Sequence, residues 1–478
     1  MSCDLTELID EVAAACGPVK IVGDPSGIRV TDVVHDSRQA STGSVFVAVP
    51  GAEHDGRDFC AGAVAAGASA LILEHPVDLD VCQLVVESPR AALAPAAATC
   101  WGHPARSLVM VGITGTNGKT TTAHLVAESL AGVGRTAVAI GTLSGARTTP
   151  ESSDLQRLLA QHVNDGVEVV VMEVSSHALT LARVDHIVFD VAVFTNLSQD
   201  HLGFHGTMES YFSAKSELFT ARRARRAVVS TGDVYGRLLV DTSEVPITPV
   251  ALDLISGVDV EVATASFVWR DVSVRLRTGG RFSVLNALLA AEVLIALGHE
   301  PAEIATALAE VPPVPGRFEP VRRGQDFDVI VDFAHTPDAL AATLETSREV
   351  AGEHRLILVF GCGGDRDRSK RPEMGRIAAR LADVTIVTND NPRSEPPAAI
   401  ISEIVAGAND PSAVEIEPDR RSAIGRAIER AESGDVVIIA GKGHETTQTI
   451  GTETSPFDDR AVAAEALDRR SAGTETSA

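Results

Sequence analysis

One glycine-rich segment, residues 112–121 with the sequence G-I-T-G-T-N-G-K-T-T, limits what this chain can fold into more than any other. An apolar run over residues 108–111 predicts a buried parallel strand before it, and residues 121–130 predict a helix after it. A strand, a glycine loop and a helix in this order form a phosphate-binding cradle, because backbone N–H groups and the helix dipole both favour an anion. Lys119 supplies a positive charge, and Thr120 is placed to ligate Mg²⁺.

This loop departs from the common G-x-x-x-x-G-K-[ST] spacing, because Gly115 lies only three residues before Gly118. An ordinary glycine turn before a helix is the alternative. The Lys-Thr pair at the start of the helix and the apolar strand before the loop favour phosphate binding over that alternative.

The length and charge of the chain narrow the class of protein. Its 478 residues are too many for one hydrophobic core and predict about three domains. The formal net charge of −24 argues against a nucleic-acid-binding surface, but it is compatible with a small anionic substrate in a local cationic pocket. With no basic and apolar leader and no apolar run of ~18 residues, we expect a cytoplasmic protein without membrane insertion. Six cysteines lack C-x-x-C spacing and are expected to be buried reduced thiols: Cys3, Cys16, Cys60, Cys82, Cys100 and Cys362.

Apolar strand-like runs alternate with helix-like stretches, which predicts an α/β fold with three domains, 1–107, 108–311 and 312–478. Residues 102–106 have the character of a linker, and the proline-rich residues 312–317 mark the second boundary. The central domain is expected to hold a P-loop NTPase-like parallel sheet. The last domain is expected to be a Rossmann-like doubly wound sheet.

Individual elements follow from the same patterns. Strands are expected at 45–49, 70–73, 167–174, 191–195, 329–333, 356–360, 384–387 and 436–440, and helices at 59–66 and 286–297. Alternation over residues 258–284 predicts antiparallel strands, and the small polar residues 471–478 are expected to fray. Ligand-binding residues of the last domain should lie at the carboxyl ends of its strands, which places Asp332, 361–371, 389–393 and 441–445 there.

Two segments of the central domain predict metal chemistry. Glu173 ends a predicted strand beside the phosphate loop, where a carboxylate often serves Mg²⁺; a solvent-facing glutamate is the alternative. His201 and His205 are four residues apart, but Gly203 and Gly206 are expected to break any helix, which disfavours a helical zinc pair. One histidine at a metal site and two structural histidines both remain open.

Lysine is scarce, because arginine supplies most of the 41 basic residues and the lysines are Lys20, Lys119, Lys215, Lys370 and Lys442. A retained lysine can reflect a need for a compact ammonium or a reactive amine, and genomic composition is the alternative. Lys215 follows a polar loop and is expected to open an apolar helix. From the residues alone, a solvated helix lysine is the favoured interpretation of Lys215.

A series of motifs occurs in one order along the chain: H-D-S-R, T-G-T-N-G-K-T-T, M-E-V-S-S-H, F-T-N-L-S-Q-D-H-L-x-x-H-G, A-K-S-E-L-F, V-D-F-A-H-T-P-D-A-L, F-G-C-G-G-D-R-D-x-x-K-R-P, D-N-P-R and A-G-K-G-H-E. With these motifs the chain resembles the Mur ligases from about residue 33 to residue 468. The resemblance implies an ATP-dependent acid–amino-acid ligase of peptidoglycan precursor synthesis. ATP would phosphorylate a substrate carboxylate, and an amine would attack the acyl phosphate. The likeness is strongest to members that add meso-2,6-diaminopimelate to UDP-MurNAc-L-Ala-D-Glu.

The resemblance also implies residue roles around ATP. ATP would be bound by Gly115, Thr116, Asn117, Gly118, Lys119, Thr120, Thr121, Asn286, Arg317 and Asp332. Mg²⁺ would be held by Thr120, Glu173, His201 and Lys215, and the catalytic set would be Lys119, Lys215, His201 and Glu173. Lys215 would be carbamylated by CO₂ to N6-carboxylysine, which arginine could not replace because its guanidinium stays protonated. This implication reverses the solvated-lysine interpretation.

The remaining roles concern the other two substrates. UDP-MurNAc-L-Ala-D-Glu would be contacted by Ser37, Thr148, Thr149, Ser175 and Arg183. Diaminopimelate would be bound by Arg366, Asp390, Asn391, Pro392, Arg393, Gly441 and Glu445. Arg393 can grip the distal carboxylate of diaminopimelate, and Glu445 can take the distal ammonium. L-Lysine lacks that carboxylate and would leave the arginine without its partner.

Some residues depart from the family's usual pattern, namely Leu181, Phe333 and Thr446–Thr447; these departures concern substrate contacts and leave the expected reaction unchanged. The same ligation with L-lysine or another diamino acid is one alternative. A folylpolyglutamate synthase-like ligase is another, although it is expected to lack the H-D-S-R domain. A non-catalytic nucleotide-binding scaffold would not need Glu173, His201 and Lys215 together. A monomer is expected.

Overall fold

The computed structural model of the protein describes residues 2–51, 54–145 and 147–475. The chain forms two compact units: one of Met1–Gly115, Gly134–Thr195 and Tyr211–Pro249, and one of Thr116–Val133, Asn196–Ser210 and Val250–Ala478. The domain boundaries predicted after residues 107 and 311 stay a prediction. None of the helices in the described ranges combines the length and the hydropathy needed to cross a bilayer.

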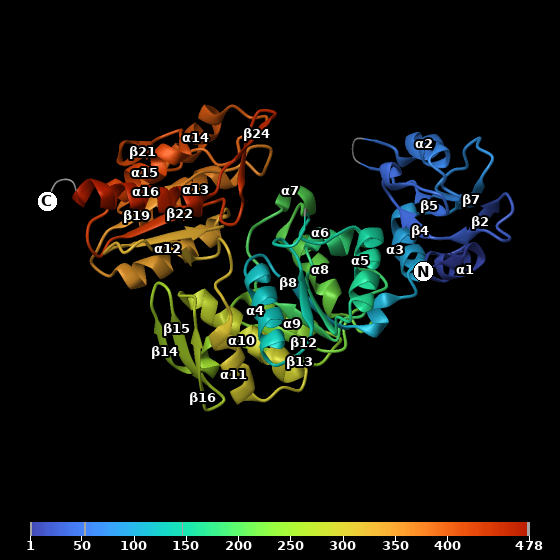
Figure 1. The fold of residues 1–478 in the computed structure, drawn as a ribbon, viewed down its shortest axis with the longest axis horizontal. Coiled ribbons are helices and arrows are strands. Elements are labelled where there is room, and N and C mark those ends of the chain that lie inside the picture. Colours follow the sequence, from blue (N-terminus) through green and yellow to red (C-terminus); the bar gives the residue numbers. More distant parts are fainter. Residues whose placement is uncertain (1, 52–53, 146, 476–478) are drawn as a thin grey trace. The chain divides into compact units, whose positions relative to one another are not determined.

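The amino-terminal part of the first unit is a five-stranded sheet in the order β2-β7-β6-β5-β4. Its elements are β2 (Lys20–Val22), β4 (Asp32–Val34), β5 (Ser44–Val47), β6 (Ala70–Leu73), β7 (Cys82–Val85), α1 (Leu5–Cys16), α2 (Cys60–Ala65) and α3 (Pro89–Cys100), with a small pair β1 (Cys3–Asp4) and β3 (Arg29–Val30) beside them. Strands β4 to β7 run parallel. Val45 and Val47 share a core with residues of α1 and α3, whereas Phe46 shares a core with residues of α2. Figure 1 shows α1 and α2 on opposite sides of this sheet. Both faces are therefore buried, which explains the continuous apolar strands.

The other sheet of the first unit has six strands in the order β13-β12-β11-β8-β10-β9. They are β8 (Val109–Thr114), β9 (Ala137–Ile140), β10 (Val169–Glu173), β11 (Val191–Phe194), β12 (Ala227–Ser230) and β13 (Ile247–Val250). Strand β8 lies between β10 and β11 and runs parallel to both. The helices of this part are α5 (Ser152–Asn164), α6 (Ser176–Thr180), α8 (Met208–Ser216) and α9 (Val234–Thr242). The predicted parallel sheet around the glycine loop is confirmed.

The second unit begins with α4 (Lys119–Gly132), the helix that follows the glycine loop. Its neighbours are α7 (Leu202–His205), α10 (Arg281–Ala296), α11 (Pro301–Glu310) and the antiparallel strands β14 (Ser256–Val260), β15 (Ala265–Trp269) and β16 (Val272–Leu276). Helix α4 packs against α10 and α11. Trp269 donates its indole N–H to Glu292 of α10 at 2.9 Å, which ties the antiparallel sheet to that helix.

The carboxyl-terminal sheet of the second unit has the order β17-β18-β22-β19-β20-β21. Its elements are β17 (Glu319–Pro320), β18 (Asp328–Asp332), β19 (Leu356–Phe360), β20 (Val384–Val387), β21 (Val414–Ile416), β22 (Val436–Ala440), α12 (Pro337–Ala351), α13 (Lys370–Leu381), α14 (Pro397–Val405), α15 (Arg420–Arg430) and α16 (Asp459–Glu475), with a hairpin of β23 (Thr447–Ile450) and β24 (Glu453–Pro456). Strands β18 to β21 are parallel, and β17 is an antiparallel edge. Helices α12 to α14 share one core with the sheet, and α15 and α16 share the other. The predicted doubly wound fold is confirmed.

Several local predictions are wrong. A short helix forms at Leu202–His205 and includes Gly203; Gly206, at φ +77°, ends it. The antiparallel segment stops at Leu276, and α10 begins at Arg281, earlier than predicted, because Gly280 at φ +89° turns the chain. Lys215 lies near the end of α8 and does not open a helix.

Two predicted irregular segments are also wrong in part. The predicted linker, residues 102–106, overlaps a 3₁₀ helix at Pro104–Ser107 in which Pro104 and Ala105 are buried. Helix α16 continues to Glu475, so fraying does not begin at residue 471; residues 476–478 lie outside the described part.

A buried ion pair fastens the last helix to the carboxyl-terminal sheet. The Arg420 guanidinium donates to both carboxylate oxygens of Asp459, at 2.8 and 2.7 Å, and neither side chain is exposed. The same guanidinium donates to the carbonyls of Ala440 and Asn389 at 3.0 and 3.2 Å. Helices α15 and α16 are therefore joined to the end of β22 through one cation.

We expect Asp459→Ala to lower the free energy of unfolding by about 3–5 kcal/mol, because Arg420 would stay buried without its carboxylate. Calorimetric or denaturant-induced unfolding would measure this loss. The control is Glu465→Ala, which removes the exposed partner of Arg421 between the same two helices and should change stability little. Equal losses in the two variants would contradict the role of the buried pair.

Candidate functional site

The glycine loop and the start of α4 are held by residues of the second unit. Lys119 Nζ donates to the carbonyl of Thr116 at 2.8 Å. Asn117 N donates to Asn196 Oδ1 at 2.9 Å, and Asn196 Nδ2 returns a bond to the Asn117 carbonyl at 3.1 Å. Thr116 and Ser198 exchange a similar pair of bonds. The lysine ammonium therefore lies on the loop beside the N-terminus of α4, where an anion would be favoured.

Asn286 lies against the same loop. Gly118 has φ +84°, and a Cβ there would come within 2.6 Å of Asn286 Oδ1. That oxygen also accepts a bond from Thr122 Oγ1 at 3.3 Å. The predicted ATP residues Gly118 and Asn286 are therefore in contact, although 168 positions separate them in the chain. Thr121 occupies the first turn of the same helix.

Arg317 reaches the same helix from the segment before β17. Its Nη2 donates to Thr120 Oγ1 at 3.3 Å, and its guanidinium lies 4.2 Å from the ring centroid of Phe333. Asp332, which precedes Phe333, accepts bonds from Phe318 N at 2.7 Å and from Thr343 Oγ1 at 3.0 Å. Burial raises the pKa of Asp332 even though Arg317 opposes the shift. The structure thus brings Arg317 and Thr120 together and places Asp332 nearby.

In the first unit, Glu173 is the last residue of β10, and its side chain is buried. Its carboxylate accepts bonds from the backbone N and the Oγ1 of Thr142, at 2.7 and 3.3 Å. The alternative of a solvent-facing glutamate is therefore wrong. Lys215 is also buried, with 1% of its surface exposed. Its Nζ donates to the carbonyl of Gly115 at 2.8 Å and lies 4.7 Å from the centroid of the Tyr211 ring, so the solvated-lysine interpretation is wrong as well.

The two histidines of the second unit lie on and beside α7. His201 caps the N-terminus of the helix at φ +54°, and its Nε2 is 3.3 Å from Asp200 Oδ2. Burial alone would raise the pKa of Asp200, but the charge of His201 and those of His335 and Lys370 lower it overall. His205 packs edge-on against Phe204. Within the described ranges, no group of three or more His, Cys, Asp or Glu side chains forms a metal-binding cluster.

Four of the five residues predicted for the UDP-substrate meet in the first unit. Thr149 Oγ1 donates to the carbonyl of Glu173 at 2.8 Å and accepts from Ser175 N at 3.1 Å. Arg183 donates to the Thr149 carbonyl at 3.2 Å, and Thr148 Oγ1 lies 3.2 Å from Thr142 Oγ1. Ser37 lies on a 3₁₀ turn after β4, and within the described part of the chain it makes no hydrogen bond to these four residues.

Arginines that the sequence did not single out gather beside this group. Glu151, just before α5, is buried and pairs with Arg183 at 2.8 Å, with Arg90 at 2.7 Å and with Arg147. These cations lower the pKa of Glu151 although burial opposes them. Three guanidiniums around one carboxylate leave a net positive charge, which suits an anionic substrate. In the sequence, Arg90 is marked only by following Pro89 at the start of α3, and that position alone does not predict a binding role.

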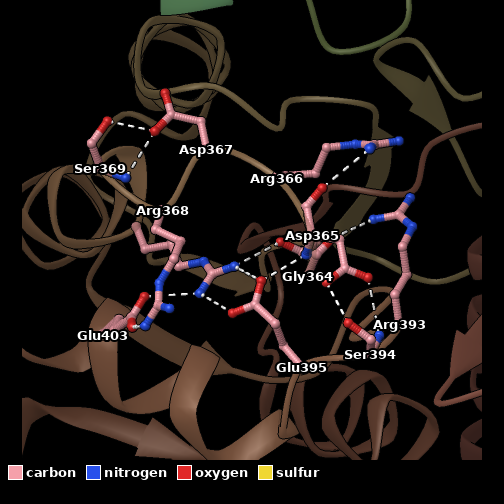
Figure 2. Close-up of polar contacts among 12 residues, drawn as sticks. Gly364, Asp365, Arg366, Asp367, Arg368, Ser369, Arg393, Ser394, Glu395 and Glu403 are labelled. Atoms are coloured by element: carbon pink, nitrogen blue, oxygen red, sulfur yellow. Dashed lines mark hydrogen bonds and ion pairs between the residues drawn. The ribbon is translucent and has the colours of Figure 1, made fainter. Parts of the chain in front are cut away.

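The residues predicted for diaminopimelate lie on three loops at the carboxyl ends of β19, β20 and β22. Arg393 Nη1 donates to the Gly364 carbonyl at 2.7 Å, and Arg366 Nη1 donates to the carbonyl of Asp365 at 3.2 Å (Figure 2). In Figure 2 the Arg366 and Arg393 side chains reach the same side of the loops. The Pro392 carbonyl accepts a hydrogen bond from the backbone N of Glu395 at 3.2 Å.

The other members of this set form a polar cluster in which Asp390 and Asn391 are buried and Glu445 is partly exposed. Asn391 Nδ2 donates to Glu445 Oε2 at 2.7 Å. Lys442, whose side chain is fully buried, donates to Asn391 Oδ1 at 3.2 Å and to Glu445 Oε2 at 3.3 Å. Burial raises the pKa of Asp390, and a Cβ on Gly441 would come within 2.9 Å of Asp390 Oδ2. Lys442, a lysine to which the sequence assigned no role, therefore contacts two of the residues predicted for diaminopimelate.

We expect Gly118→Ala to weaken ATP binding about tenfold or more, because the new methyl would displace Asn286; each ~1.4 kcal/mol lost is a factor of ten. Isothermal titration with ATP would measure the change. Gly134→Ala is the matched control: its φ is also +84°, but nothing lies within 4 Å of the new Cβ. It should show backbone strain as a lower melting temperature without a loss of ATP affinity. Equal affinities in both variants would contradict the contact.

Comparisons with known proteins show the family of this chain. Family profiles match residues 29–100 (Mur ligase family, catalytic domain), 113–294 (Mur ligase middle domain) and 316–443 (Mur ligase, glutamate ligase domain). UDP-N-acetylmuramoyl-L-alanyl-D-glutamate–2,6-diaminopimelate ligase of Streptomyces coelicolor is 42% identical, covering 97% of this chain and 96% of its own. The Geobacillus kaustophilus protein of that name is 44% identical, with 91% and 94% covered. A solved structure of such a ligase has a TM-score of 0.69 and 30% identity, covering 98% of this chain and 100% of its own. The chain belongs to the Mur ligase family.

Proposed function

We propose that this protein is an ATP-dependent ligase that joins meso-2,6-diaminopimelate to UDP-MurNAc-L-Ala-D-Glu in peptidoglycan precursor synthesis. The observation that carries the proposal is the grouping of Arg393 with Asn391 and Glu445 at the ends of parallel strands. Relatives at 42% and 44% identity bear the name of this activity. The proposal includes a cytoplasmic, monomeric enzyme.

The amino-acid specificity follows from charge pairing. Diaminopimelate carries a carboxylate beside its distal ammonium, and L-lysine carries the ammonium alone. The Arg393 guanidinium offers a two-pronged donor to that carboxylate, and the Glu445 carboxylate accepts from the ammonium. Bound L-lysine would leave Arg393 without an anionic partner, and such an unpaired group typically costs orders of magnitude in specificity.

The part of the proposed active site that would bind ATP, the phosphoryl donor, is the glycine loop. ATP would transfer its γ-phosphoryl group to a substrate carboxylate, and the amine of diaminopimelate would then displace phosphate to form the amide. The obstacle is that an anion must approach an anion. Lys119 lies on the loop at the N-terminus of α4, where its charge and the helix dipole both reduce this repulsion. Arg317 adds a cation that contacts the same helix at Thr120.

The donor set fits Mg²⁺. Hydroxyl and carboxylate oxygens from Thr120 and Glu173 are ligands that Mg²⁺ prefers, and His201 would add a nitrogen. Mg²⁺ usually keeps several waters and bridges substrate phosphates, so it does not require a cluster of three acidic or histidine side chains. When bound, the ion would neutralise phosphate charge. Lys215 would join this set as a carbamate.

The UDP-substrate would be held by the group around Arg183. Thr149 and Ser175 are already hydrogen-bonded to each other, which fixes their hydroxyls before the substrate arrives. The net positive charge of the three arginines around Glu151 would attract the anionic substrate. Ser37 would complete the contact from the amino-terminal sheet.

Phosphate release is expected to require ATP, UDP-MurNAc-L-Ala-D-Glu and diaminopimelate at the same time. A coupled assay for ADP and phosphate, with mass spectrometry of the tripeptide product, would test this. Equal rates with L-lysine would overturn the specificity but not the ligation. Release with no amino acid present would overturn the ligase assignment itself.

The Lys215→Ala variant is expected to lose most of its activity and to regain part of it when a short carboxylic acid is added, because the acid would replace the carbamate group. Lys20→Ala, an exposed lysine of β2, is the control and should keep full activity. Carbon-13 NMR with labelled bicarbonate should show a carbamate signal in the unmodified protein and not in Lys215→Ala. Full activity of Lys215→Ala without added acid would contradict the carbamate.

A further inference from the structure

A buried arginine lies beneath the proposed diaminopimelate loops, outside the set of residues that the resemblance implied. Arg371, in the first turn of α13, has no exposed side-chain surface. Its Nη2 and Nη1 donate to the two carboxylate oxygens of Glu395 at 2.8 and 2.9 Å. Nη1 also donates to Glu403 at 2.8 Å, and Nη2 donates to the carbonyl of Gly363 at 3.2 Å. One guanidinium thus joins two loops and α14.

Glu395 connects this ion pair to the neighbouring loop, the one that contains Asp365. Its Oε1 accepts from the backbone N of Asp365 at 2.6 Å. The Asp365 carboxylate in turn accepts from Ser394 N at 3.1 Å and from Ser394 Oγ at 2.6 Å (Figure 2). Ser394 and Glu395 directly follow Arg393 in the chain. The hydrogen-bond network that starts at Arg371 therefore reaches Glu395 directly and Ser394 through Asp365, and these are the two residues that follow Arg393.

Arg393 needs such support, because its backbone is in the left-handed region at φ +52°. Asp365, across the loop interface, has φ +54°. Residues other than glycine keep this conformation only where their surroundings hold them in it. The Arg393 side chain is directed by one further bond, from Nη1 to the Gly364 carbonyl at 2.7 Å, and Gly364 N donates to Asn391 O at 2.9 Å. The position of Gly364 therefore decides the direction of the Arg393 guanidinium.

We propose that Arg371 and Glu395 are positioning residues for the amino-acid substrate: their ion pair holds residues 361–371 against residues 390–395 and so directs Arg393 toward the distal carboxylate of the diamino acid. This inference rests on the function proposed above. Arginine is needed because three acceptors surround one planar group, and a lysine ammonium cannot match a bidentate carboxylate. The Arg371 guanidinium also lowers the pKa of Glu395 to about 2, so the pair stays charged at neutral pH.

The alternative is a purely structural role, in which the Arg371–Glu403 pair holds α13 and α14 together. Glu403 belongs to α14 and pairs with the buried Arg371. It also contacts the largely exposed Arg368 (Figure 2). Loss of a purely structural link would lower the stability of the domain and would change KM for all three substrates together. A positioning role acts through Glu395 alone and affects the amino acid selectively. The two roles therefore differ in a kinetic measurement.

Two variants test the proposal: Arg371→Lys, which keeps the charge, and Glu395→Gln, which keeps the shape and removes the charge. Each is expected to raise KM for diaminopimelate about tenfold to a hundredfold, because small displacements of a positioning group have effects of that size. The preference for diaminopimelate over L-lysine should fall by a similar factor. KM for ATP and for the UDP-dipeptide should stay within about twofold, because those contacts do not pass through this network.

Arg368→Ala is the matched control. It removes an arginine that shares Glu403 but does not touch Glu395, and 63% of its side chain is exposed. Its three KM values and its amino-acid preference should match the unmodified protein, and melting temperatures should accompany every variant. If Arg371→Lys does not fold, the isosteric Glu395→Gln decides the question.

Unchanged KM for diaminopimelate in Glu395→Gln would overturn the proposal, and so would an equal rise of KM for all three substrates. Failure of the proposed function has a different signature, because the unmodified protein would then fail to turn over diaminopimelate at all. Loss of amino-acid preference with normal ATP and UDP-dipeptide kinetics would support the positioning role.

Discussion

Helices cover both faces of the parallel strands β18, β22, β19 and β20, and this burial decides where chemistry can take place in the carboxyl-terminal sheet. An unpaired polar group between such layers would lose its water without compensation. Polar side chains are therefore confined to the strand ends, and parallel strands place all their carboxyl ends at one edge. Asp332, Asp390 and Gly441 each lie at or just after the end of such a strand, which is why motifs far apart in the chain meet.

The second organising feature is the pairing of buried cations. Arg371, Arg420 and Lys442 have fully buried side chains, and each contacts at least one carboxylate. A buried charge without a partner would cost several kcal/mol, so each pair fixes the segments that carry its two members. Arg420 joins a helix to the sheet, whereas Arg371 joins the loops that follow β19 and β20. The same physical requirement thus serves stability in one place and orientation in the other.

The sequence predicted the strands well, because β6, β19, β20 and β22 are short apolar runs bounded by turn residues. It predicted less well where tertiary contacts decide the outcome. The local pattern around Lys215 predicted an exposed helix residue. Its ring contact with Tyr211 lies within one helix, but its hydrogen bond to Gly115 joins positions 100 residues apart, which no local pattern encodes. The helix at residues 202–205 forms in spite of Gly203, because a glycine costs only about 1 kcal/mol of helix propensity and the backbone N–H of Gly206 closes the turn on the Leu202 carbonyl.

The amino-acid sequence by itself determined the order of strand, glycine loop and helix around Lys119, and the residue types that a diaminopimelate site would need. These are local properties: apolar periodicity, glycine conformations and side-chain chemistry. Only the tertiary structure decided that Arg371 meets Glu395, 24 residues away, and that Glu395 meets Asp365, 30 residues away. Those meetings depend on β19 and β20 being neighbours in the sheet, and strand order is set by the packing of the whole domain.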